Sequence, residues 1–126
     1  MYQRRSLDDL DRIDVDDVEP DLKAAGYELR PEKMRPSLWL FEPGEANNWH
    51  RQREQEELFL VLSGRLEVTV DDETFEVGSG DVLVVSPESW RQLSALEASR
   101  VFVVGAPNVK DDGVREGDDE VREGDA

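Results

Sequence analysis

The stretch that decides the fold is PGEANNWHRQREQEELFLVLSGRLEVTV, residues 43–70. It contains His50, the only histidine of the 126-residue chain, and leads through polar and acidic residues into the apolar segment LFLVL. His50 and Gln52 are two residues apart, so on an extended chain their side chains point to the same side. Glu57 begins the apolar segment, where successive side chains alternate between two faces. The stretch therefore predicts a strand that carries polar groups into an apolar interior.

Further strand-like segments with turn residues between them fill residues 27–108. They are short, apolar and rich in β-branched residues, and no long amphipathic helix pattern interrupts them. This pattern predicts an all-β sandwich or barrel. A hairpin is expected with its turn at Asp71-Asp72, and GSGD at 78–81 is interpreted as a second hairpin turn. The predicted strands are SLWLFE (37–42), ELFLVLS (57–63), RLEVTV (65–70), ETFEV (73–77), DVLVVS (81–86), RQLSAL (91–96) and RVFVVG (100–105).

Two acidic segments flank this predicted domain. Residues 1–26 are interpreted as a short helical arm, with Ser6 as a helix cap and a second short helix from Leu22 to Ala25. Residues 109–126 contain VREGD twice and too few apolar residues to bury, so we expect a disordered tail. The chain is thus predicted to hold one domain with an arm and a tail.

Composition excludes several classes of function. The chain has no cysteine, which rules out disulfides, thiolate zinc sites and cysteine nucleophiles. Its net charge of -16 disfavours binding to nucleic acid and to anionic membrane surfaces. Its longest apolar runs fall far below the roughly 20 residues of a membrane helix. We expect a cytoplasmic protein, and the excess of acid over lysine indicates a salt-loving microbe rather than an acidic mesophilic protein.

The spacing of five residues carries a resemblance to a known family. Gly44, His50, Gln52, Glu57 and Gly64 resemble the first motif of the cupins, G-x5-H-x-H-x3–4-E-x6-G. Gln52 stands where the second histidine of the motif belongs.

A second motif strengthens the resemblance. GDVLVVSPESWRQ, residues 80–92, is similar to the second cupin motif, in which Gly80, Asp81 and Pro87 match and Arg91 takes the place of the last histidine. The resemblance implies a cupin-type jelly-roll barrel, usually a homodimer, with a pocket inside the barrel. In many cupins three histidines and the glutamate of these motifs hold one divalent metal in that pocket.

Four side chains should then meet in the barrel mouth: His50, Gln52, Glu57 and Arg91. They leave three alternatives open. They form a metal-free pocket that binds a small carboxylate, sugar or phosphorylated metabolite, with Arg91 supplying the charge opposite Glu57. Alternatively, His50, Gln52 and Glu57 hold one divalent metal ion, or the four residues are a hydrogen-bonded relic. Glu56 replaces Glu57 as the inward carboxylate if the strand shifts by one residue.

We expect a cupin that binds or senses a small molecule without catalysis, and the cofactor stays open between none and one divalent metal ion. The alternative is a metal-dependent oxygenase or isomerase with one divalent metal ion. No residue is assigned a catalytic role, and whether the chain is an enzyme stays open at this point. Aromatic residues are candidates for the pocket wall: Trp39, Trp49, Phe59 and Trp90.

Overall fold

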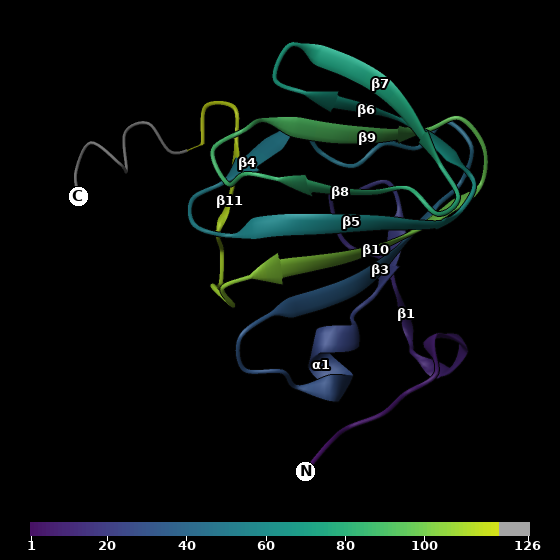
Figure 1. The fold of residues 1–126 in the computed structure, drawn as a ribbon, viewed down its shortest axis with the longest axis vertical. Helices are drawn as coiled ribbons and strands as arrows, with labels where there is room; N and C mark the ends of the chain where they lie inside the picture. Colours follow the sequence, from purple (N-terminus) through teal and green to yellow (C-terminus); the bar gives the residue numbers. More distant parts are fainter. Residues whose placement is uncertain (119–126) are drawn as a thin grey trace.

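The computed structural model describes residues 1–118 and shows two antiparallel sheets that face each other as a jelly-roll barrel (Figure 1). This confirms the all-β fold class. The six-stranded sheet has the order β1-β2-β3-β10-β5-β8, and the five-stranded sheet has the order β11-β4-β9-β6-β7. Strands of the first sheet are β1 (Arg12–Ile13), β2 (Asp21–Lys23), β3 (Arg35–Phe41), β5 (Glu56–Ser63), β8 (Val82–Val85) and β10 (Ser99–Ala106). Strands of the second are β4 (His50–Gln52), β6 (Arg65–Val70), β7 (Glu73–Gly78), β9 (Arg91–Ala95) and β11 (Gly113–Arg115).

All seven strands predicted from the sequence are present, with small shifts at their ends. The predicted hairpin is β6–β7, in which Val70 pairs with Glu73 around a turn at Asp71, whose φ is 52°. The turn at GSGD exists as well, because Asp81 N donates to Gly78 O at 2.9 Å. It is not a hairpin turn, since it leads from β7 in one sheet to β8 in the other. That turn closes the barrel at one edge.

Gly64 allows the chain to pass directly from β5 into β6. Its φ is +94°, a backbone conformation that residues other than glycine rarely adopt. A Cβ atom at this position would overlap Ala98 and Ser99 and lie 2.6 Å from Ser99 Cα. Gly64, the last glycine of the first motif, is therefore required for a steric reason: two strand ends come too close for any side chain.

The N-terminal arm is partly helical but also adds strands to the sheet. A 3₁₀ helix spans Leu7–Asp9 after Ser6, which makes no side-chain capping bond. The second helix was placed wrongly: Asp21–Lys23 is strand β2, paired with β3, and helix α1 follows at Ala25–Leu29. Pairing with the edge of β3 determines the structure of this segment rather than its helix propensity, because the pairing satisfies the backbone groups of both strands.

The segment from residue 109 onward, expected as a disordered tail, contains a strand in its described part. Strand β11 pairs with β4, and Val114 in its centre is fully buried. The ladder partner and this single buried valine outweigh the polar composition of the segment. Residues 119–126, which carry the rest of the predicted tail, lie outside the described residues.

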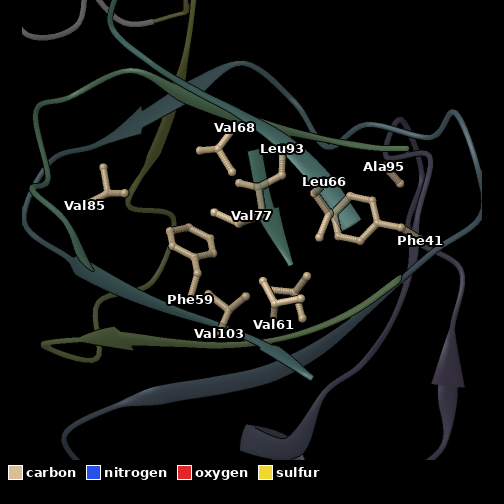
Figure 2. Packing of buried hydrophobic residues seen from close by; sticks show 11 residues of the cluster. Phe41, Phe59, Val61, Leu66, Val68, Val77, Val85, Leu93, Ala95 and Val103 are labelled. Atoms are coloured by element: carbon tan, nitrogen blue, oxygen red, sulfur yellow. The ribbon is translucent and has the colours of Figure 1, made fainter. Parts of the chain in front are cut away.

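The core lies between the two sheets (Figure 2). Phe59 and Val61 of β5 pair with Val103 and Val101 of β10, and all four point inward. Burial of such a side chain contributes about 1.5–3 kcal/mol of stability. In residues 1–118, no helix is long and apolar enough to cross a membrane. The other buried members of the core are Phe41, Leu66, Val68, Val77, Val85, Leu93 and Ala95.

Candidate functional site

A cavity of about 300 Å³ lies inside the barrel, bounded by residues of both sheets. Its volume is at the lower end of the range of about 300–1,000 Å³ found for small-molecule sites. One part of the wall is aromatic or aliphatic: Trp39, Phe41, Phe59, Leu93, Val101 and Val103. The rest of the wall is polar or glycine: Asn47, Asn48, His50, Gln52, Glu57, Gly113, Arg115 and Asp118. The cavity thus combines an apolar surface with a small set of polar groups.

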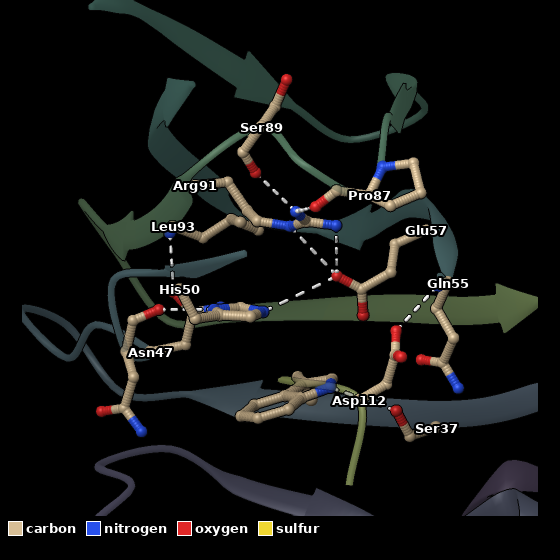
Figure 3. A network of polar contacts seen from close by, with 12 residues as sticks. Ser37, Asn47, His50, Gln55, Glu57, Pro87, Ser89, Arg91, Leu93 and Asp112 are labelled. Atoms are coloured by element: carbon tan, nitrogen blue, oxygen red, sulfur yellow. Dashed lines mark hydrogen bonds and ion pairs between the residues drawn. The ribbon is translucent and has the colours of Figure 1, made fainter. Parts of the chain in front are cut away.

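Glu57 forms an ion pair with Arg91 at the wall of this cavity (Figure 3). Arg91 Nε donates to Glu57 Oε1 at 3.2 Å, and Arg91 Nη2 lies 3.0 Å from the same oxygen. The Nη2 contact is an ion pair without an aligned N–H group, since Nη2 makes no hydrogen bond within residues 1–118. The figure shows the second carboxylate oxygen of Glu57 turned away from the guanidinium. That oxygen is the one left for other partners.

Arg91 is fully buried and lies behind Glu57. Its Nη1 donates to Ser89 O at 2.6 Å, to Pro87 O at 3.0 Å and more weakly to Ser86 O at 3.4 Å. These carbonyls hold the guanidinium in one orientation. Among the residues that the structure describes, Arg91 is not part of the cavity wall. In this conformation it therefore acts on the cavity through Glu57.

The protonation of this pair follows from its surroundings. Burial raises the pKa of Glu57, but the interaction with His50 and the charge of Arg91 outweigh it, so the pKa lies below its ordinary value. Burial lowers the pKa of Arg91, opposed by the charge and the hydrogen bond of Glu57. The guanidinium stays protonated because its ordinary pKa is above about 12. The site therefore contains a carboxylate and a guanidinium, both ionised.

His50 is the third member of the site. Its Nδ1 lies 2.7 Å from Asn48 O, and since a carbonyl only accepts, we assign the proton to Nδ1. Nε2 then faces Glu57, 3.7 Å from Oε1. His50 pairs directly with Arg91 across strands β4 and β9. This register explains how residues distant in the sequence meet at one carboxylate.

Gln52 completes the set and carries a buried acceptor. Its side chain helps to lower the pKa of the Glu57 carboxyl group. Its Oε1 is buried and has no hydrogen-bond partner within residues 1–118. Gly113 lies opposite Gln52 in the β4–β11 ladder, and a Cβ atom there would lie 3.7 Å from Gln52 Oε1. A buried acceptor without a partner costs about 1–3 kcal/mol, which a donor would recover once the Gln52 side chain turns this oxygen toward the cavity.

The four predicted site residues therefore lie together, and Glu57 rather than the exposed Glu56 is the inward carboxylate. Trp39 and Phe59 line the cavity as expected. Trp49 and Trp90 do not: their rings stack on each other at 6.0 Å, and the guanidinium of Arg51 lies over Trp90 at 5.7 Å.

Sequence reasoning missed the contribution of the C-terminal segment. Gly113, Arg115 and Asp118 line the cavity from β11 and the residues that follow it. The only signal in the sequence was Val114, a single apolar residue among charged ones, which is too little to predict a strand.

The donor set does not match that of a divalent-metal site. In residues 1–118, no three histidine, cysteine, aspartate or glutamate side chains are grouped to hold a metal ion. His50 supplies one imidazole, Gln52 a weak amide donor, and Glu57 Oε1 already lies against the guanidinium of Arg91. A cation at this oxygen would be repelled by Arg91. The metal site of His50, Gln52 and Glu57 stays a prediction from the sequence, and no chemical step is built on it.

One family model and several solved structures are similar to the chain. A family model described as Cupin domain matches residues 37–105. KdgF from Halomonas is 23% identical with a TM-score of 0.70, over 82% of this chain and 94% of that one. A sugar phosphate isomerase of the cupin superfamily from Silicibacter pomeroyi is 19% identical with a TM-score of 0.73, over 84% and 76% of the two chains.

A putative sugar phosphate isomerase from Acidithiobacillus ferrooxidans is 22% identical with a TM-score of 0.64. The match covers 71% of this chain but only 60% of that protein. No curated protein matches the sequence. At such identities these structural likenesses establish the fold.

Proposed function

The chain belongs to the cupin family, and from this premise we propose that its barrel cavity binds a small, hydroxyl-rich molecule of the sugar class without converting it. The observation that carries the proposal is the buried Oε1 of Gln52, an acceptor without a partner in the described residues, beside the ionised Glu57. Of the ligand classes expected from the sequence, namely carboxylates, sugars and phosphorylated metabolites, this pair of acceptors favours molecules that bring hydroxyl groups.

The polar groups at the inner wall include two hydrogen-bond acceptors, so a matching ligand must supply donors. The Gln52 oxygen and the outward oxygen of Glu57 can only accept, since Glu57 is ionised. Sugar hydroxyl groups donate and also accept, so they satisfy both atoms. A carboxylate or phosphate at this position would instead be repelled by Glu57.

The apolar part of the wall fits the same class of ligand. Trp39 and Phe41 stack with ring centroids 6.3 Å apart, and both border the cavity together with Phe59. Their flat apolar faces can pack on the C–H groups of a sugar ring. The cavity of about 300 Å³ limits the ligand to the size of a monosaccharide.

Binding without conversion follows from the state of Glu57. A general base works best with a pKa near the working pH, and the pKa of Glu57 lies below its ordinary value. Its Oε1 is also held by Arg91 at 3.0 Å. Glu57 is thus a poor proton acceptor, and the site is better suited to holding a ligand. Two structural neighbours are named sugar phosphate isomerase, and at their identities the likeness extends to the fold.

Isothermal titration calorimetry with a set of monosaccharides tests the proposal, with a linear dicarboxylate as a comparison ligand. The decisive variant is Gly113→Ala, because the added methyl group would lie 3.7 Å from Gln52 Oε1 and cover it. The matched control is Gly78→Ala, where the added Cβ meets nothing closer than 3.8 Å and lies away from the cavity wall.

We expect monosaccharide binding that weakens about tenfold or more in Gly113→Ala, the equivalent of one lost hydrogen bond, and is unchanged in Gly78→Ala. If no monosaccharide binds, or if Gly113→Ala binds as well as the unaltered protein, the proposal is wrong.

A further inference from the structure

We propose that Arg115, on the C-terminal strand, binds an anionic group of the ligand, so that the ligand is a monosaccharide carrying one carboxylate or phosphate. This inference rests on the proposed function and makes the ligand class narrower. It assigns a specificity-determining role to a residue outside both sequence motifs.

The register of β11 places Arg115 beside two of the candidate site residues. In the β4–β11 ladder Arg115 pairs with His50, and Gly113 pairs with Gln52. Directly paired residues of neighbouring strands have their side chains on the same face of the sheet. Arg115 therefore shares the face of His50 and Gln52, and it lines the same cavity.

Strand β11 is held firmly enough to position a ligand group. The buried carboxylate of Asp112 accepts from Gln55 N at 2.7 Å and from Glu54 N at 3.0 Å. Arg53 N donates to Asp112 O at 3.1 Å, and Val114 is fully buried. These contacts join the start of β11 to the loop that connects β4 and β5.

The positive charge of the Arg115 guanidinium is available to a ligand. In the amide orientation that satisfies both neighbours, Asn48 Oδ1 accepts from Arg115 Nη2 at 2.7 Å, and Asn48 donates to Asp17 O. Within residues 1–118, no carboxylate lies within 4.0 Å of this guanidinium, whereas those of Arg12, Arg65 and Arg91 are all paired.

The other charged groups of the cavity have partners of their own. Glu57 and Arg91 compensate each other at 3.0 Å. Asp118 also lines the cavity, but its Oδ2 accepts from the backbone N of Arg115 at 3.1 Å in a turn. In a chain with a net charge of -16, a cavity-lining arginine without a carboxylate partner in the described part of the chain is suited to an anion from outside.

The two ends of the site therefore differ in polarity. Gln52 and Glu57 present acceptors for hydroxyl groups, and Arg115 presents N–H donors with a positive charge. A guanidinium matches the geometry of a carboxylate or phosphate, which it binds through paired charge-assisted hydrogen bonds. A sugar acid and a sugar phosphate each supply both kinds of group in one small molecule.

The test uses the full chain and isothermal titration calorimetry at one fixed salt concentration. The probes are glucose, galactose and mannose, their uronic acids and their 6-phosphates. The decisive variant is Arg115→Gln, which keeps a donor to Asn48 and removes the charge. The control is Arg100→Gln, since Arg100 is exposed on β10 and its Nε donates to Ser63 Oγ, away from the cavity wall.

We expect at least one anionic probe to bind about tenfold or more tightly than its neutral parent sugar, a preference lost in Arg115→Gln and kept in Arg100→Gln. Affinity for the neutral sugars should stay the same in both variants. Preference for uronic acids alone or for 6-phosphates alone supports the inference and identifies the anionic group.

Two results would overturn it and leave the proposed function standing. One is equal affinity of the unaltered protein for neutral and anionic sugars. The other is a preference for anionic sugars that survives in Arg115→Gln. Binding of no sugar at all, neutral or anionic, would instead refute the proposed function and this inference with it.

Discussion

Replacing Arg91 by methionine tests whether the guanidinium neutralises Glu57 inside the barrel. The substitution keeps a long side chain but removes the guanidinium. Within the described residues, its Nε and Nη2 are the only cationic nitrogen atoms within 3.2 Å of Glu57 Oε1. It also removes the donors to Ser89 O and Pro87 O. The carboxylate of Glu57, whose side chain is only 13% exposed, then has no cation beside it.

The expected loss follows from the burial of both partners. Removing one partner of a buried ion pair costs about 3–5 kcal/mol, because the other charge stays buried without compensation. Arg91 is fully buried and Glu57 nearly so, which places this pair in that class rather than among surface pairs worth about 0–1 kcal/mol. Since proteins of this size are stable by about 5–15 kcal/mol, the variant should fold with much reduced stability.

Urea unfolding followed by circular dichroism measures the effect, at neutral pH, in a double-mutant cycle. The second arm combines Glu57→Leu with Arg91→Met, which removes both charges and should recover most of the loss. Arg100→Met is the control, because Arg100 is exposed. A cost below about 1 kcal/mol in Arg91→Met, or a double variant no more stable than Arg91→Met alone, would refute the reasoning.

Four further outcomes are expected. The pKa of Glu57 is lowered in the folded chain, so its contribution to stability is present above its unfolded pKa of about 4.3 and is lost as the pH falls through the lower folded value. Urea unfolding of Glu57→Gln should therefore show a smaller loss of stability in this acid range than the unaltered chain. Identical pH profiles of the two proteins would contradict this. Gly64→Ala should abolish folding as judged by circular dichroism, whereas Gly80→Ala, with φ +89° and nothing within 4 Å of the added Cβ, should cost only about 1–2 kcal/mol; similar costs would show that steric overlap is not the reason for Gly64. The double variant Gln52→His/Arg91→His places three imidazoles beside Glu57, so calorimetry should show cobalt binding at least about tenfold tighter than in the unaltered chain, and equal affinity would argue against the geometry. If the chain comes from a salt-loving microbe, its free energy of unfolding should rise between about 0.1 M and 3 M potassium chloride as repulsion is screened, and a flat dependence would remove that expectation.

The fold was predictable because its strands alternate clearly. Glu57, Phe59 and Val61 face the interior, and the ladder with β10 confirms this alternation residue by residue. The resemblance of the two glycine-containing motifs to the cupins predicted that His50 and Arg91 meet in one barrel mouth. The structure shows them directly paired between β4 and β9.

Other parts could not be predicted, for reasons that differ between segments. Strands β2 and β11 are three residues long, so no period can be recognised in them, and pairing with β3 and β4 decides their structure. The position of Arg115 at the cavity wall depends on that pairing. Likewise, nothing in the sequence distinguishes Trp39, which borders the cavity, from Trp90, which stacks on another tryptophan outside it.

The position of β11 separates part of the cavity wall from the hydrophobic core. The buried members of the core end at Val103 in the described residues. Gly113 and Arg115 line the cavity beyond that point of the sequence and add no side chain to the core. Substitutions at these two positions can therefore change which ligand is bound while every side chain of the core is kept, so ligand preference and fold are separable in this barrel.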